Sequence, residues 1–224
     1  MAKITWRGGA LLAPVPPALV TVGDMENANI ITVAWTGIVN TVPPKTYISV
    51  RPRRHSYEIL KERGEFIINL TPTSLVHAAD FCGMYTGAKV DKFAKLGLTK
   101  QAVEGFSAPA IAECPLSLCC RVTEIIPMGS HDMFLADIVS VQIDDSLLDE
   151  NGKLYIARAD LAAFAHGEYF ALGKSLGSFG FSAVKKKKKS KAVPKKAQPT
   201  EKKTAPSKKK QPTTYKKKKP KVKQ

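Results

Sequence analysis

The stretch from Asn27 to Tyr57 constrains the fold more than any other part of the chain. Residues 29–39 are β-branched or apolar at nearly every position, and residues 46–50 alternate between apolar and polar side chains. These patterns predict two strands joined by a turn over residues 40–44, where two prolines stand together. The stretch therefore predicts a buried β-hairpin.

A cluster of cations follows this hairpin directly. Three arginines and a histidine occupy four of the five positions before Ser56, namely Arg51, Arg53, Arg54 and His55. The Ser56 hydroxyl is suited to cap a helix over residues 57–63, and Gly64 is suited to end that helix. Because guanidinium groups and the free N–H groups of a helix start both attract anions, the segment predicts a phosphate site. An ordinary helix cap beside an exposed basic loop is the alternative.

The composition changes abruptly near residue 184. Residues 185–224 contain 19 Lys and one Glu, a net charge of +18, whereas residues 1–184 carry a net charge of −2. With no apolar residue larger than Val except Tyr215, the basic segment cannot bury a core and is predicted to be a disordered tail. Its charge predicts binding of nucleic acid or other polyanions without sequence preference. Acidic proteins, anionic membrane surfaces and simple solubilisation are alternatives.

The predicted organisation is one folded domain over residues 1–184 and a Lys-rich tail over residues 185–224. Cys82, Cys114, Cys119 and Cys120 show neither C-x-x-C spacing nor histidines at metal-ligand spacing, which indicates reduced thiols and no metal site. Three prolines interrupt the apolar run over residues 10–22, so no signal peptide is predicted. No other apolar run reaches the length of about 20 residues that a membrane span needs. We therefore expect a soluble, cytoplasmic protein.

Four further segments have the length and composition of strands. They are residues 18–22, 65–70, 116–126 and 134–143, and the last two predict a second hairpin around Gly129. Short helices are predicted over residues 75–82 and, after a capping Asp91, over residues 92–96. No repeat and no alternating series of strands and helices is present. The pattern favours a mainly β fold with flanking helices, in which an antiparallel sheet closes into a barrel.

Several pieces of the sequence, in order, carry a family resemblance. They are N-x-x-T-x-A-W at residues 29–35, S-V-R-P-R-R-H-S at 49–56, F-x-I-N-L at 66–70, A-D-F-C-G at 79–83 with V-D-K-F at 90–93, and G-S-H-D-x-F at 129–134. Together they resemble the flavin reductase-like family, of the flavoredoxin type, over about residues 10–183. The resemblance implies an antiparallel split β-barrel and a homodimer with one FMN per subunit near the interface.

The resemblance also implies roles for single residues. Asn29, Trp35, His131 and Phe164 would lie against the flavin, while Ser56 and Lys92 would bind its phosphate. The cation cluster, independently of the resemblance, adds Arg51 and Arg54 to the predicted cofactor-binding residues. The family has Thr where Ser56 stands, and Ser keeps the hydroxyl group. From the residues alone, Lys92 would be a solvated surface lysine, His131 a polar turn residue, and Trp35 and Phe164 core residues.

The implied function is that of an FMN-binding oxidoreductase or electron-transfer flavoprotein that moves electrons between NAD(P)H or a redox protein and an acceptor. Flavin supplies the redox chemistry, so a catalytic triad is not required. No glycine motif for nucleotide binding identifies the donor. The alternative function is a polyanion-binding protein in which the barrel serves only as a dimerising module.

Overall fold

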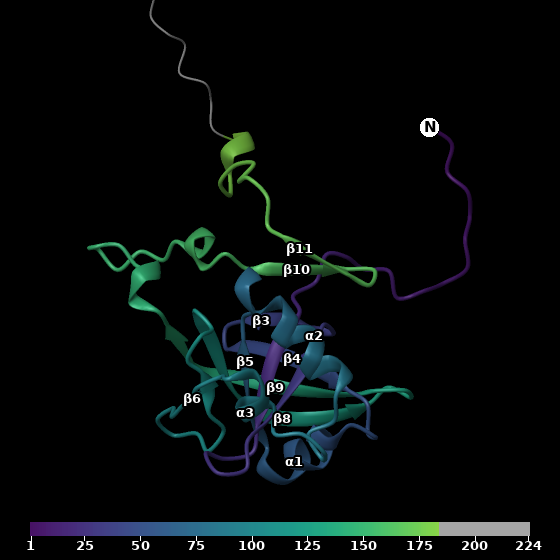
Figure 1. Cartoon of the computed structure of the whole chain (residues 1–224). Helices are drawn as coiled ribbons and strands as arrows, with labels where there is room; N and C mark the ends of the chain where they lie inside the picture. Colours follow the sequence, from purple (N-terminus) through teal and green to yellow (C-terminus); the bar gives the residue numbers. More distant parts are fainter. Residues whose placement is uncertain (184–224) are drawn as a thin grey trace, which may run out of the picture. The chain divides into compact units, whose positions relative to one another are not determined.

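Seven antiparallel strands form the main sheet of the protein (Figure 1), in the order β2-β1-β5-β8-β9-β4-β3. The strands are β1 (Ala18–Val22), β2 (Asn29–Val33), β3 (Thr36–Thr41), β4 (Pro44–Val50), β5 (Glu65–Asn69), β8 (Leu116–Pro127) and β9 (Asp132–Ile143). The edge strands β2 and β3 follow one another in the chain, so the sheet curls until the end of β2 reaches the start of β3. Elsewhere β2 and β4 face each other across an opening. The predicted mainly β, split-barrel fold is confirmed.

Three short helices flank the sheet, namely α1 (His55–Arg63), α2 (Val76–Met84) and α3 (Lys92–Leu96). Two small hairpins complete the fold, one made of β6 (Lys100–Gln101) and β7 (Ala110–Ile111), the other of β10 (Ala162–Ala165) and β11 (Glu168–Ala171). Single 3-10 turns span Thr73–Leu75, Asp145–Leu147 and Ile156–Ala159. Among the described residues, no helix combines the length and apolar character needed to cross a membrane.

Strand β1 is buried on both faces because it separates two parts of the core. Val20 and Val22 point into the barrel, where they pack with Phe66 and Phe134. Leu19 belongs to the opposite face, in the cluster that includes side chains of α2 and α3. This division follows from the alternation of side chains along a strand. It places α2 and α3 against the β2 side of the barrel, beside the opening.

The prediction of one strand over residues 29–39 is wrong. β2 ends at Val33 and pairs with β1, whereas β3 begins at Thr36 and pairs with β4. The side chains of β3 are half-buried at its start and exposed from Ile38 onward, so the hairpin lies at the sheet edge and is not buried as a whole. The apolar pattern runs through Ala34 and Trp35 without a break, and such a pattern does not report which strand supplies the hydrogen-bond partners.

The predicted helix after the cation cluster exists, but Ser56 does not cap it. α1 begins at His55 with the extended Arg54 at its N-cap, and no side chain caps the helix. Gly64 ends α1 in the left-handed conformation, as predicted (φ 63°). The predicted cap at Asp91 is also confirmed, since its carboxylate accepts from the backbone N–H of Ala94. The two predicted caps differ because Ser56 has a distant partner, described below.

The structure describes residues 1–183, so the predicted disordered tail, residues 185–224, lies outside the described residues. Contacts divide the chain into two units, Met1–Ser175 and Leu176–Gln224. Every element named so far belongs to the first unit, and the described part of the second contains the 3-10 turn η4 (Phe181–Ala183). The predicted domain boundary after residue 184 stays a prediction.

Candidate functional site

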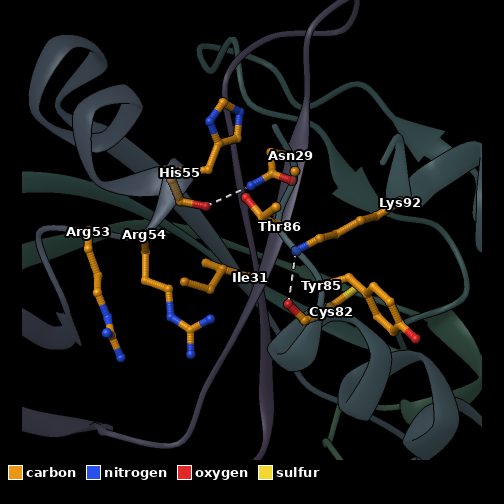
Figure 2. Close-up of a pocket in the computed structure, with 11 residues that line it drawn as sticks. Asn29, Ile31, Arg53, Arg54, His55, Cys82, Tyr85, Thr86 and Lys92 are labelled. Atoms are coloured by element: carbon orange, nitrogen blue, oxygen red, sulfur yellow. Dashed lines mark hydrogen bonds between the residues drawn. The ribbon is translucent and has the colours of Figure 1, made fainter. Parts of the chain in front are cut away.

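One end of the barrel opening is a pocket surrounded by cations and hydrogen-bonding side chains (Figure 2). It is formed by the start of α1, by β2, and by the end of α2 with the loop that follows. Its lining residues are Asn29, Ile31, Arg53, Arg54, His55, Ser56, Cys82, Tyr85, Thr86, Gly87 and Lys92. Figure 2 shows Arg53 and Arg54 entering from one side of this cationic pocket and Lys92 from the opposite side. Four of the predicted site residues, Asn29, Arg54, Ser56 and Lys92, therefore meet here.

Ser56 and Asn29 form a buried polar pair in the pocket. The Asn29 side-chain amide donates to the Ser56 hydroxyl oxygen (2.8 Å). Asn29 is 7% exposed and Ser56 is 1% exposed. This bond holds Ser56 toward β2 and explains why it does not cap α1. A hydroxyl that accepts one bond keeps its own proton to donate. Because no side chain caps α1, the first N–H groups of the helix also remain available to an anion.

Gly87 is required by the close approach of the loop after α2 to Asn29. A Cβ atom at position 87 would lie 2.1 Å from Asn29 Oδ1 and 2.5 Å from Asn29 Cγ. No side chain fits at this distance, so the glycine lets the loop close over the polar pair. The position of the Asn29 amide thus depends on the absence of a side chain at residue 87.

Lys92 is a buried cation without an acidic partner. Its side chain is 3% exposed, and its ammonium group donates to the carbonyls of Ile30 (2.6 Å) and Cys82 (2.9 Å). The ion pairs of the described residues all form elsewhere. Burial lowers the pKa of Lys92, and the charge of the neighbouring Arg54 lowers it further. An anionic ligand in the pocket would supply the missing negative charge.

Arg54 links the two helices that border the cationic pocket. Its guanidinium group donates to the carbonyl of Gly83 near the end of α2 (3.1 Å). The Cys82 thiol also borders the pocket, but burial raises its pKa to about 11. At neutral pH this thiol is protonated and is not a nucleophile. The pocket therefore presents cations and hydrogen-bond donors, and its cysteine is a protonated thiol.

A groove continues from the cationic pocket along the barrel opening. The groove and the pocket share Ile31 and Arg54. The groove is lined by the rest of β2, by the end of β4 and by the other predicted site residues, namely Trp35, Arg51, His131 and Phe164. All eight predicted residues thus line one continuous opening, four of them in the cationic pocket and five in the groove, with Arg54 in both.

His131 lies in the groove beside Arg51. Burial lowers its pKa, and the charges of Arg51 and Arg54 lower it further. The Arg51 Nε–H donates to His131 Nε2 (3.3 Å). With Nε2 as an acceptor, the ring proton resides on Nδ1, which lies 2.9 Å from the Ser130 hydroxyl oxygen. Arg51 thereby fixes both the ring position and the tautomer.

Trp35 and Phe164 supply aromatic surface to the groove. Trp35 occupies the link between β2 and β3 and is 39% exposed, so it is not the core residue that its type alone suggests. Phe164 belongs to β10 and packs edge-on against Tyr169, with ring centroids 5.1 Å apart. Backbone bonds between Val15 and Phe164 (2.8 and 2.9 Å) hold β10 against the N-terminal segment.

Sequence reasoning missed the loop of Tyr85, Thr86 and Gly87 as a wall of the pocket. The available signal was the V-D-K-F piece, which places Lys92 just after this loop and so brings the loop near the site. The small size of Gly87 carries no signal of its own, because the distance to Asn29 is set by tertiary structure.

An antiparallel barrel that is split between β2 and β4, with cations at one end of the opening, is the architecture of the flavin-binding split-barrel class. A domain model for this class, described as "Flavin reductase like domain", matches residues 11–173. The chain belongs to the flavin reductase-like family.

The chain is similar to several known proteins of this kind. Flavoredoxin of Desulfovibrio vulgaris (Miyazaki F) has a structure that superposes with a TM-score of 0.76 at 32% identity, covering 82% of this chain and 100% of that chain. The structure of flavoredoxin from Methanosarcina acetivorans superposes with a TM-score of 0.75 at 27% identity, covering 82% of this chain and 100% of that chain. A protein of Streptomyces viridifaciens named NADPH-flavin oxidoreductase is 25% identical over 153 residues, which are 66% of this chain and 78% of that protein.

Proposed function

We propose that the protein is an FMN-dependent oxidoreductase or electron-transfer flavoprotein of the flavoredoxin type. The observation that carries this proposal is the buried ammonium group of Lys92, which has no acidic partner among the described residues and faces a pocket bordered by two arginines. A buried charge is costly unless it is paired. A phosphate group of the ligand is the partner that these donors fit.

The donors are arranged as a phosphate requires. Lys92 and Arg54 provide charge, the Ser56 hydroxyl provides a proton, and the uncapped start of α1 provides backbone N–H groups. Asn29 holds Ser56 in position and presents its own amide. These residues would bind the FMN phosphate, and Trp35, Arg51, His131 and Phe164 would border the flavin ring in the groove. Bound FMN supplies the redox chemistry by accepting hydride or single electrons.

The residues of the groove have distinct tasks. His131 presents a polar ring edge to the groove, and burial, followed by the charges of Arg51 and Arg54, lowers its pKa. Arg51 itself places a fixed positive charge beside the groove, which favours electron-rich, reduced states of a bound ligand. Trp35 and Phe164 would offer aromatic surface to the flavin ring.

The electron donor, the assembly and the compartment belong to the same proposal. The relative named NADPH-flavin oxidoreductase supports NADPH as donor, with a redox protein as the alternative.

The exposed apolar residues of the β3–β4 hairpin, Ile38, Val39 and Val42, support a homodimer that covers them. The four cysteines are free thiols, which supports a cytoplasmic location.

The comparison of FMN with riboflavin tests the proposal directly. The two ligands share the ring and differ by the phosphate, so we expect FMN to bind the purified full-length protein at least about 100-fold more tightly, as two charge-assisted hydrogen bonds would give. Ser56→Asp places a negative charge against the phosphate and removes this preference, whereas the control Ser74→Asp at an exposed position does not. Equal affinity of the wild type for FMN and riboflavin would refute the phosphate site, and a protein that binds neither would refute the function.

A second candidate function rests on the charge of +18 in residues 185–224. These residues lie outside the described part of the chain, and the candidate comes from composition alone. We propose that this segment binds nucleic acid or other polyanions through counterion release. The two functions reside in separate parts of the chain and are compatible.

A further inference from the structure

A second cavity adjoins the groove on the side away from the cationic pocket. It has a volume of about 450 Å³, within the range of about 300–1,000 Å³ that is usual for small-molecule sites. The cavity and the groove share Ala34, Trp35, Ser49 and His131. A molecule in this cavity would therefore lie next to whatever occupies the groove.

The walls of this cavity differ chemically from those of the cationic pocket. Its lining includes Leu12, Trp35, Tyr47, Met128 and Met133, and no Lys, Arg, Asp or Glu lines it. Methionine side chains adapt to ligands of different outline, and the aromatic rings of Trp and Tyr favour planar partners. The polar side-chain groups in its lining are hydroxyl groups, the indole N–H of Trp35 and the His131 ring.

Two contacts position Tyr47 in the cavity wall. Tyr47 lies across from Gly37 in the β3–β4 register, and its ring covers the glycine, since a Cβ at residue 37 would lie 3.5 Å from Tyr47 Cε1, an ordinary contact distance. The Thr36 hydroxyl donates to the Tyr47 carbonyl (2.6 Å), which fixes the strand at this point. The small residue Ala34 borders the cavity where it joins the groove.

We propose that this cavity binds the electron acceptor and that the acceptor is a neutral, planar, apolar molecule such as a quinone. The proposal rests on the proposed flavin function, because the cavity gains its role from the neighbouring groove. Reduction of a quinone to its hydroquinone consumes two electrons and two protons, which reduced FMN held in the groove would supply while it is converted to oxidised FMN. The acceptor site is thus separate in place and in charge from the phosphate site.

A nicotinamide nucleotide fits this cavity poorly. Its phosphate groups carry negative charges that need cations or free N–H groups. The cations of the opening, Arg51 and Arg54, border the groove and not this cavity. An anionic occupant would leave its charge in an apolar site, which is unfavourable.

Binding of the acceptor can be measured without turnover. The chain has two tryptophans, so Trp6→Phe leaves Trp35 as a reporter at the boundary of cavity and groove. We expect naphthoquinone to quench the Trp35 fluorescence of the FMN-free, full-length Trp6→Phe protein in a saturable way. Naphthoquinone sulfonate, of similar shape but anionic, should bind about tenfold more weakly because its charge must leave water.

Met133→Lys should change the preference for naphthoquinone over naphthoquinone sulfonate, because it adds a charge at nearly constant side-chain length. The new ammonium group should weaken naphthoquinone binding and strengthen naphthoquinone sulfonate binding, so that the order of the two affinities reverses. The control Met25→Lys makes the same replacement at an exposed position outside the cavity and should leave the order unchanged.

The outcomes separate this proposal from the flavin function. Reversal of the order in Met133→Lys alone supports the acceptor cavity. Absence of saturable quenching, equal affinity for the two quinones, or equal behaviour of the two Lys variants overturns it. FMN binding is followed separately by its visible absorbance, so a protein that binds FMN but shows no quinone preference loses only the cavity proposal. A protein with the quinone preference but without FMN binding loses the flavin function and hence the acceptor role.

Discussion

Replacement of Lys92 by Met distinguishes a ligand-binding lysine from a structural one. The residue is 3% exposed, and its ammonium group donates to the carbonyls of Ile30 and Cys82. Met keeps the length and the apolar part of the side chain while it removes the charge and both hydrogen bonds. The substitution therefore isolates the contribution of the ammonium group.

Two opposing terms set the stability of the FMN-free variant. The two lost bonds are charge-assisted and contribute about 1.5–3 kcal/mol each. Burying the unpaired ammonium group costs several kcal/mol even after relaxation of the surroundings. Because these terms are of similar size, we expect the free energy of unfolding to change by less than about 2 kcal/mol. FMN affinity should fall about 10- to 100-fold, since one charge-assisted bond to the phosphate is lost.

Chemical unfolding with and without FMN provides the assay. In the wild type, FMN should stabilise the fold according to its concentration and dissociation constant. Lys92→Met should lose most of the stabilisation that FMN adds. Its free energy of unfolding without FMN should stay close to that of the wild type. The control Lys89→Met, at an exposed position of the preceding loop, should match the wild type in both respects. A variant that loses more than about 3 kcal/mol of unfolding free energy yet binds FMN as tightly as the wild type would show that Lys92 is structural.

The lowered pKa of Lys92 adds a pH dependence with a definite sign. Burial is the main cause of the shift, so the folded protein without ligand releases this proton below the ordinary pKa of 10.5. A bound phosphate favours the charged form, and the bound state therefore takes up a proton. FMN affinity should fall as the pH rises through the lowered pKa toward 10.5. Lys92→Met should lack this decline, and titrations from neutral pH upward compare the two slopes.

Three further predictions concern other parts of the chain. Gly87→Ala displaces the Asn29 amide and should weaken FMN binding about tenfold, as loss of one hydrogen bond would. Gly173→Ala, whose Cβ meets nothing within 4 Å, serves as its control in the same titration. Tyr57→Phe removes the bond from the Tyr57 hydroxyl to the Asp132 carboxylate and should lower the free energy of unfolding in urea by about 1–2 kcal/mol. Removal of residues 185–224 should abolish nucleic-acid binding and leave FMN affinity unchanged. In the full-length protein, that nucleic-acid affinity should fall about 1,000-fold between about 50 and 200 mM salt if six phosphates are engaged, and an affinity insensitive to salt would contradict the prediction.

The elements that sequence predicted well are those in which local pattern and tertiary environment agree. β5 is buried at all five positions, and its three consecutive apolar residues, Phe66, Ile67 and Ile68, predict a strand buried on both faces. The β8–β9 hairpin turns near Gly129 (φ 95°), where the sequence predicts the turn. Asp91 caps α3 with its own side chain, an interaction that spans three residues. In each case the partner is close in sequence or the pattern itself encodes burial.

The elements that sequence predicted incorrectly depend on distant partners. Ser56 has the side chain of a helix cap, but its hydroxyl oxygen accepts from Asn29, which is 27 positions away. Lys92 resembles a surface lysine until α3 packs it against β2 and α2. Tertiary contacts override local preference at these positions, and both positions border the candidate site. Sites are where such local rules fail most often.

The break between β2 and β3 explains why one stretch of sequence supplies both ends of the site. β2 brings Asn29 to the cationic pocket, and the link that follows places Trp35 in the groove. The chain then crosses to the opposite edge of the sheet and returns through β4 to Arg51 and Arg54. A ligand in the opening would therefore lie between β2, at one edge of the sheet, and β4, next to the other edge, and the chain passes from one side to the other through Ala34 and Trp35. If residues 29–39 formed one strand, the chain would not pass from β2 to the other side of the opening at Ala34 and Trp35. The break that makes the single-strand prediction wrong is therefore also the feature that creates the site.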